Sequence, residues 1–304
     1  MIALRRIDHV ALRVADVPEA AARWAVQFGL TARSIAPGRA LLSCDDEPYA
    51  LELLAGAEPG HDHTAFELAR TCPLELAAAH LRSREVVVEQ REDALFCADP
   101  EGNRIQLMPH RETGAPPAHA RSTSSLPGDH PRKLGHVNFL TGRIAAGVEF
   151  YTEALGMRLT DWLGDAGVWF HVNSDHHVMA LVDKGRAHFH HLALDVVDVG
   201  QMRSALDHLG RHGRWLGWGP ARHGVGGNVA SYVRIVEEAC FVELYVDMEQ
   251  LDVDHRPRRW PDDRFSSNTW GPLPPRSYFR FDPVAIEYER ESLETQGRLL
   301  PDPT

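Results

Sequence analysis

An internal repeat constrains the fold of this 304-residue chain more than any other feature. The segments IDHVALRVADVPEAAARWAVQFGL (7–30) and LGHVNFLTGRIAAGVEFYTEALGM (134–157) each place a histidine at the head of an alternating apolar run. In both copies a glycine lies twenty positions after that histidine. Alternation predicts a strand, and the residues that follow are typical of a helix. The sequence therefore predicts two related domains that begin in the same way.

Each predicted domain divides once more into two similar units. HTAFEL (63–68) and HLALDV (191–196) again begin a strand with a histidine, 54 residues after His9 and 55 residues after His136. A unit of this length reads as a strand, a helix and several further strands, and Gln201–His212 suits the helix of the last unit. The predicted fold class is α+β, built from four such units.

The stretch TGAPPAHARSTSSLPGDHPR, rich in Pro, Ser and Gly, predicts a linker. We therefore expect an N-terminal domain over 1–112, a linker over 113–132, a C-terminal domain over 133–250 and a tail over 251–304. The tail is expected to wrap or cover the C-terminal domain, with its last residues frayed.

Composition excludes several classes of function. A net charge of −11, with no run of five or more Lys or Arg, argues against nucleic acid as a partner. The sequence has neither a membrane-spanning apolar stretch nor a signal peptide at its start, so we expect a cytoplasmic protein without membrane contacts. Its four cysteines are too scattered for a disulfide framework or a metal knuckle.

Alternation also predicts which side chains share a face of each strand, because successive side chains point to opposite sides. In HLALDV the leucines suit packing under helices, which leaves His191 on the other face. The same reasoning places His136 of GHVNFL and Glu243 of CFVELYV on the faces away from the helices. A curled sheet would bring these three side chains to one concave surface. Two imidazoles and one carboxylate match the set that holds a non-haem Fe(II) and leaves other positions open.

Five motifs together resemble a known family. GHVNF, HHVMAL, HHLALDV, GPARHG and VELY occur in the order and with the separations of the two-domain type I extradiol, or catechol 2,3-dioxygenase-like, enzymes of the vicinal oxygen chelate superfamily. The resemblance covers about residues 5 to 270 and includes WPDDRFSSNTWGP (260–272) near its end. It implies paired βαβββ modules in two similar domains, each a curled mixed sheet around a central cup, with the metal in the C-terminal domain.

The resemblance also assigns roles to individual residues. It implies that His136, His191 and Glu243 are the metal ligands, since the family's second ligand directly precedes the apolar strand. Of the pair in HHVMAL, the second, His177, corresponds to the acid–base histidine. GPARHG supplies His223, a residue near the substrate oxygen. The remaining histidines of this region are expected to be a solvated neighbour (His176) and structural residues (His188, His190).

The family's active-site tyrosine lies nine residues after the last histidine, which here is Tyr232. Counting back from Glu243, however, Tyr232 is eleven residues away where ten are usual. The hairpin between them lacks the DPxGN turn that the N-terminal half keeps as ADPEGNR (98–104). We expect a longer turn around Glu237–Cys240 that keeps both strands in register, whereas a bulge within a strand would turn Tyr232 away.

The N-terminal half offers a similar but incomplete set. His9 and His63 occupy positions like those of the ligands, but the third position is Gln106, a neutral amide without charge to offset a cation. We therefore expect an N-terminal domain without metal.

The resemblance implies extradiol cleavage of a catechol by O₂ to a semialdehyde-type product, with Fe(II), or alternatively Mn(II), as cofactor and a homodimer or homotetramer as the assembly. Within the same superfamily, a glyoxalase-like metal-dependent isomerase or lyase is the alternative. It would explain the repeat and the ligands but gives no joint part to His177, Tyr232 and His223. A ligand-sequestering protein of the bleomycin-resistance type is the third candidate, and it would not need Glu243.

Overall fold

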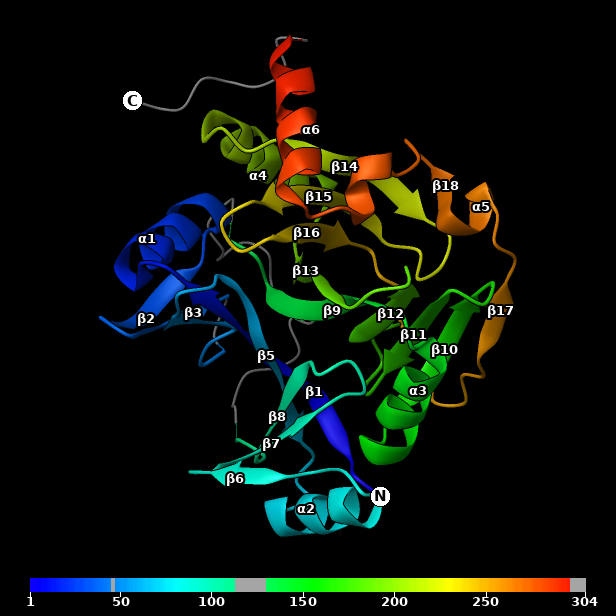
Figure 1. Cartoon of the computed structure of the whole chain (residues 1–304). Coiled ribbons are helices and arrows are strands. Elements are labelled where there is room, and N and C mark those ends of the chain that lie inside the picture. Colours follow the sequence, from blue (N-terminus) through cyan, green and yellow to red (C-terminus); the bar gives the residue numbers. More distant parts are fainter. Residues whose placement is uncertain (45–46, 113–129, 296–304) are drawn as a thin grey trace.

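Two mixed sheets, one from each half of the chain, form the body of the protein in the computed structural model, which describes residues 1–44, 47–112 and 130–295 (Figure 1). The first sheet has eight strands and the second has ten. Most of the predicted linker lies outside the described residues, as do residues 296–304 at the end of the predicted tail.

The first sheet contains two units with the same order of elements. The first unit consists of β1 (Leu4–Val14), α1 (Val17–Phe28), β2 (Thr31–Ala36), β3 (Arg39–Ser43) and β4 (Leu51–Ala55). The second consists of β5 (Gly60–Leu68), α2 (Leu74–Ser83), β6 (Glu89–Arg91), β7 (Ala94–Ala98) and β8 (Arg104–Met108). The order β2-β3-β4-β1-β5-β8-β7-β6 places the first strands of the two units side by side, antiparallel to each other. Each first strand is parallel to the last strand of its own unit.

The second sheet repeats this arrangement. Its third unit consists of β9 (Lys133–Thr141), α3 (Ile144–Glu149), the π-helix η3 (Phe150–Ala154), β10 (Arg158–Leu163), β11 (Gly167–His171) and β12 (Met179–Asp183). The fourth consists of β13 (His188–Asp195), α4 (Val199–Arg211), β14 (Leu216–His223), β15 (Val229–Ile235) and β16 (Cys240–Val246). β9 and β13 pair antiparallel at the centre, and each is parallel to the last strand of its unit.

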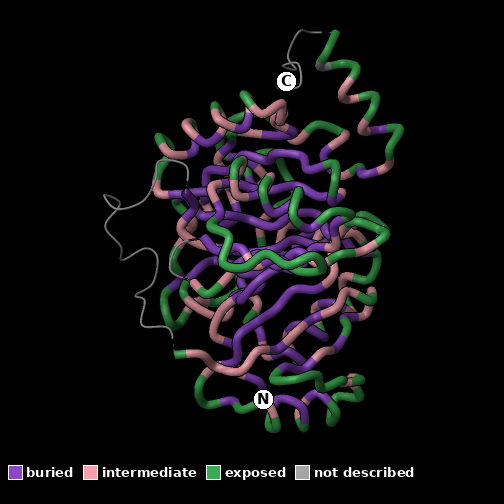
Figure 2. Tube along the Cα trace, turned by 90° about the vertical axis from the view of Figure 1, so that its left-hand side faces the viewer, coloured by how far each residue is buried: buried purple, intermediate pink, exposed green. Residues whose placement is uncertain are grey.

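The predicted tail extends this second sheet at both edges. β17 (Arg258–Trp260) pairs in parallel with β10, and β18 (Asn268–Trp270) pairs antiparallel with β14. Between them lies the short helix α5 (Arg264–Ser267), and after them the 3₁₀-helix η4 (Arg276–Phe279) and the helix α6 (Pro283–Thr295). α6 projects from the body in both views (Figures 1 and 2) and exposes Val284 and Tyr288.

The repeated glycine ends the first helical segment of each half. Asp16 accepts a hydrogen bond from the Glu19 amide at the start of α1, and Gly29 ends this helix with φ 66°. Gly156 follows η3 with φ 71°. A left-handed backbone of this kind is the usual end of a helix, and it favours glycine because a side chain is strained there.

The two faces of the second sheet contribute to different apolar clusters, as strand alternation predicts. Leu192, Leu194 and Val242 belong to the large core under the helices. Ala193 and Phe241 belong to a separate, mainly aromatic cluster on the opposite face. The predicted helix of the last unit is α4, which begins after the capping residue Asp198, two residues earlier than expected from the sequence.

Ion pairs and ring stacking join the two halves of the chain. Arg23 of α1 pairs with Glu238, with 2.5 Å between Nη2 and Oε1. The hydroxyl of Tyr151 donates to Oδ2 of Asp99, at 3.0 Å. His61 of β5 stacks on Phe189 of β13 with the ring centroids 4.5 Å apart. Of the helices in the described residues, none combines the length and the apolar character needed to span a membrane.

The environment of Gly156 predicts an unusually large cost for adding a methyl group there. A Cβ at this position would overlap the carbonyl oxygen of Ile2, in addition to the strain of φ 71°. Gly185 has a similar φ of 68° but no atom within 4 Å of such a Cβ, so it isolates the strain alone. We expect Gly185→Ala to lower the free energy of unfolding by about 1 kcal/mol and Gly156→Ala by roughly 1–3 kcal/mol more. Urea denaturation of both variants measures the difference, and equal losses would contradict the proposed overlap.

Candidate metal centre

Three buried side chains on neighbouring strands of the second sheet converge on one point. His136 lies on β9, His191 on β13 and Glu243 on β16, and both His136 and Glu243 are paired with Ala193 of the strand between them. Nε2 of His136 lies 3.0 Å from Oε2 of Glu243, and Nε2 of His191 lies 3.1 Å from the same oxygen. The structure thus brings together the three predicted ligand positions.

Glu243 is held in its ionised form with one oxygen directed at the two imidazoles. The other oxygen, Oε1, accepts a hydrogen bond of 2.9 Å from the side-chain amide of Asn228. Burial by itself opposes ionisation, but His136 and His191 outweigh it and hold the pKa of the Glu243 carboxyl well below its usual value. Two ring nitrogens and one carboxylate oxygen on a shared face are a donor set that fits a divalent ion such as Fe(II).

Tyr232 lies inside this site because the extra residue of the hairpin falls in the turn. β15 and β16 pair without interruption from Val229 opposite Val246 to Ile235 opposite Cys240, so Tyr232 is directly opposite Glu243. The tyrosine hydroxyl lies 2.8 Å from Nε2 of His223 on β14. Its pKa is raised well above the usual value, first by burial and then by the charge of Glu243. The phenol therefore keeps its proton and can donate it.

His177 lies beside the three converging side chains, on the segment that precedes β12. Its ring centroid is 4.2 Å from that of His136. Burial, followed by the neighbouring rings of His136 and His176, lowers the pKa of His177 well below its usual value. The imidazole is therefore neutral and able to accept a proton.

The expectation that His176 is solvated is wrong. It is fully buried, with Nδ1 3.0 Å from Nδ1 of His177 and Nε2 3.1 Å from Oδ2 of Asp161 on β10. The side chains of Arg258 and Trp260 in β17 donate to the same carboxylate. Asp161 therefore fixes the ring of His176, and His176 in turn fixes the ring of His177. Alternation could not indicate this, because the pair of histidines lies outside a regular strand and Asp161 belongs to another strand.

The remaining two histidines lie behind the site or outside it. Nδ1 of His190 is 2.8 Å from Nδ1 of His191, and Nε2 of His190 is 3.0 Å from the carbonyl oxygen of Tyr278. His190 thus links a candidate ligand to η4. His188 contacts the carbonyl oxygen of Ala239 and stacks on Phe281.

A cavity of about 230 Å³ adjoins the site. Its wall includes the polar side chains described above, His136, His177, His191, His223, Tyr232 and Glu243. Mainly apolar and aromatic residues complete the wall: Trp169, Ala180, Val182, Trp218, Tyr278 and Phe279. An apolar cavity of about 150 Å³ holds a benzene molecule, so this one has room for a single substituted aromatic ring. The segment after β17 contributes Ser266, Ser267 and Pro274 to its wall.

The first sheet contains a second convergent group, which includes a carboxylate that sequence reasoning missed. Glu52 of β4 lies with His9 and His63, and their potential ligand atoms are within 4.8 Å of one another. The amide oxygen of Gln106 is 3.0 Å from Nε2 of His63. In the sequence, LELLA (51–55) is an apolar strand with one glutamate. It contains no histidine, which is the residue that identified the ligand motifs of the second half. An acidic side chain therefore lies beside these two histidines in addition to the neutral Gln106.

Comparison with known proteins agrees with this architecture. Residues 133–234 match the Glyoxalase/Bleomycin resistance protein/Dioxygenase superfamily. This match lies in the second half of the chain, which is therefore similar to proteins of the vicinal oxygen chelate superfamily. Its predicted fold, two similar α+β domains of paired βαβββ units, is confirmed.

Individual proteins are similar to this chain over most of its length. Metapyrocatechase 2 of Cupriavidus necator is 28% identical over 301 residues, covering 91% of this chain and 92% of its own. The crystal structure of a Mn(II)-bound glyoxalase from Novosphingobium aromaticivorans has a TM-score of 0.82 at 23% identity, over 91% of this chain and 94% of its own. Homoprotocatechuate 2,3-dioxygenase of Brevibacterium fuscum, in complex with 3,4-dihydroxyphenylacetate, has a TM-score of 0.80 at 21% identity, over 91% and 92%.

The contacts of Asp161 predict a pH-dependent contribution to stability. Burial opposes its ionisation, but hydrogen bonds from His176, Arg258 and Trp260 outweigh this and lower the pKa to about 2, from an ordinary 3.8. Because the folded pKa is the lower one, ionised Asp161 stabilises the fold above about pH 3.8, and this contribution is lost as the pH falls towards 2.

We expect Asp161→Asn to cost on the order of 1–3 kcal/mol at pH 7, with the difference from wild type shrinking between about pH 4 and pH 2. Denaturant unfolding across this pH range measures both effects. Asp165→Asn is the control, because that carboxylate is 98% exposed. A difference that is constant with pH would contradict the role assigned to Asp161.

Proposed function

We propose that this protein cleaves the ring of a catecholic compound with O₂ at a bond adjacent to the diol, using a metal ion, Fe(II), bound by His136, His191 and Glu243. The observation that carries the proposal is the meeting of these three side chains with His177, Tyr232 and His223 in the wall of one cavity. Two relatives bear names for this chemistry, metapyrocatechase 2 and 3-methylcatechol 2,3-dioxygenase, the second at 24% identity.

Among the described residues, only three potential ligands converge at this centre, and this supports ring cleavage over the alternative, a glyoxalase-like isomerase or lyase. The Mn(II)-bound glyoxalase shares the fold, so the fold does not separate the two activities. In the first sheet, Glu52 is paired with Ala11, two residues after His9. The same position in the second sheet is Ala180, paired with Asn138, two residues after His136. Because alanine offers no donor atom, a metal ion held by His136, His191 and Glu243 would keep room for the catechol oxygens and O₂.

A bound ferrous ion would supply open coordination positions and would make the catechol hydroxyls more acidic. Within the described residues, the neutral imidazole of His177 faces this space and is suited to take a proton from a hydroxyl of the diol. It can later return that proton to the leaving oxygen when the aromatic ring opens. His176 and Asp161 fix the orientation of His177, so that it does not have to be ordered during the reaction.

Tyr232 and His223 are proposed to position the substrate on the opposite wall of the cavity. Oδ1 of Asn268 accepts the Nδ1 hydrogen of the neutral His223, so Nε2 of His223 accepts from the Tyr232 hydroxyl, whose oxygen can in turn accept a hydrogen bond from a substrate hydroxyl. Trp218 stacks on Tyr232 with an interplanar angle of 11° and their ring centroids 5.0 Å apart. A rigid aromatic wall of this kind is suited to a flat ring.

A homodimer or homotetramer and a cytoplasmic location stay predictions from the sequence.

Anaerobic reconstitution with Fe(II) followed by O₂ uptake tests the proposal directly. With catechol and substituted catechols, we expect stoichiometric O₂ consumption and a yellow ring-opened product. Glu243→Ala should abolish both, because it removes the only charged ligand of this set. Glu153→Ala, which changes an exposed glutamate of η3, should leave both unchanged. Metal bound at His136, His191 and Glu243 without O₂ uptake for any catechol would favour the isomerase or lyase.

The assignment of His177 predicts a loss of turnover without a loss of metal. A positioned acid–base group contributes about 10²–10⁴ in rate, so we expect His177→Phe to lower kcat by that factor. Its Fe(II) content should equal that of the wild type, because His177 is not among the ligands. Steady-state kinetics with a metal assay checks both, and unchanged turnover would remove His177 from this role.

A further inference from the structure

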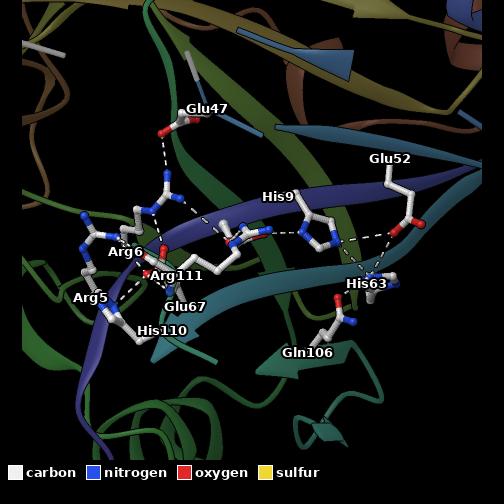
Figure 3. A network of polar contacts seen from close by, with 11 residues as sticks. Arg5, Arg6, His9, Glu47, Glu52, His63, Glu67, Gln106, His110 and Arg111 are labelled. Carbon is white, nitrogen blue, oxygen red and sulfur yellow. Dashed lines mark hydrogen bonds and ion pairs between the residues drawn. The ribbon is translucent and has the colours of Figure 1, made fainter. Parts of the chain in front are cut away.

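Four side chains in the first sheet point at one another from four different strands: His9 of β1, Glu52 of β4, His63 of β5 and Gln106 of β8 (Figure 3). Nε2 of His9 is 3.3 Å from Nε2 of His63 and 3.4 Å from Oε2 of Glu52. Nε2 of His63 is 3.6 Å from that oxygen and 3.0 Å from Oε1 of Gln106.

These separations are those of ligand atoms around a single metal ion. With bonds of about 2.1 Å, neighbouring ligand atoms lie about 3.0 Å apart in octahedral and about 3.4 Å apart in tetrahedral coordination. The two imidazoles also have the mutual orientation of the candidate ligands in the second sheet. The ring centroids of His9 and His63 are 5.3 Å apart at 80°, and those of His136 and His191 are 5.5 Å apart at 80°.

The donor and acceptor pattern of this group calls for a cation at its centre. Nδ1 of His9 lies 2.6 Å from Oδ1 of Asp8, and Nδ1 of His63 lies 2.8 Å from Oδ1 of Asp62. A neutral imidazole that donates its Nδ1 hydrogen to a carboxylate has a lone pair at Nε2. In that arrangement four acceptor atoms meet: Nε2 of His9, Nε2 of His63, Oε2 of Glu52 and Oε1 of Gln106. None of these four atoms carries a hydrogen to donate to the others. Carboxylates behind histidines in this way also orient and strengthen metal ligands.

The surroundings distinguish this site from the open one in the second sheet. His9, Glu52 and His63 are buried, and the ring of Tyr49 packs 4.7 Å from that of His9. Arg39 donates to Oε1 of Glu52, which leaves Oε2 for the centre. A set of four protein ligands without an open position is typical of metals that stabilise a fold.

We propose that the first half of the chain binds a second divalent transition-metal ion through His9, Glu52, His63 and Gln106, and that this ion stabilises the fold. The site is independent of ring cleavage and replaces our expectation of a metal-free N-terminal domain. The competing arrangement places a second proton on His9 in place of the metal, so that the imidazolium bridges Asp8 and Glu52.

Counting metal ions separates the two arrangements. Chelator-treated protein is reloaded with Zn²⁺ and desalted, and its zinc is measured by mass spectrometry. We expect about two ions per chain for the wild type and about one each for Glu52→Gln and Glu243→Ala, with almost none in the double variant. Glu52→Gln keeps the shape of the side chain, and His80→Ala, a histidine of α2 outside both groups, should keep about two.

Thermal unfolding provides a second measurement in case a variant loads poorly. In the Glu243→Ala background, Zn²⁺ should raise the Tm, and adding Glu52→Gln should remove most of that shift. Glu243→Ala protein that binds no zinc and shows no shift in Tm would overturn the proposal in favour of the protonated His9. Because that background lacks a carboxylate ligand in the second sheet, this outcome is independent of whether the protein cleaves catechols.

Discussion

Both candidate centres depend on the antiparallel pairing of the first strands of two neighbouring units. In each sheet this pairing, β1 with β5 or β9 with β13, places one histidine from each strand on the same face. Each of these first strands pairs in parallel with the last strand of its own unit, and that last strand contributes one further residue to the centre. No single unit can assemble such a group. Each centre is therefore formed at the contact between two units, and it cannot form until those units have paired.

The same joint yields two different environments because the flanking residues differ. In the first sheet, carboxylates lie behind both histidines and a glutamate stands at the fourth position. In the second sheet, a neutral histidine lies behind His191 and an alanine stands at the fourth position. The first arrangement favours tight enclosure of a cation, whereas the second leaves one side of the centre facing a cavity. A few side chains on a common scaffold thus decide between an enclosed and an accessible centre.

The sequence predicts those parts of the site that local periodicity determines. The strand positions of His136, His191 and Glu243 follow from alternation. Tyr232 is implied by the family resemblance, and it lies in the site because the extra residue of its hairpin falls in the turn. Contacts between distant segments are not encoded in this way. Glu52 reaches the first centre only through the parallel pairing of β1 with β4, and Asp161 reaches His176 only because β10 and the segment before β12 come together. Such partners could not be identified without the strand order.

The segment from Arg258 to Phe279 completes the second centre from a position later in the sequence than all of its candidate ligands. It holds His223 through Asn268, His190 through the Tyr278 carbonyl and Asp161 through Arg258 and Trp260. All three candidate ligands precede it, so a ribosome releases them before the residues that enclose them. During synthesis the centre passes through a stage in which its ligands are present but its outer wall is missing. The order of residues along the chain therefore allows a metal to enter first and the wall to close over it afterwards.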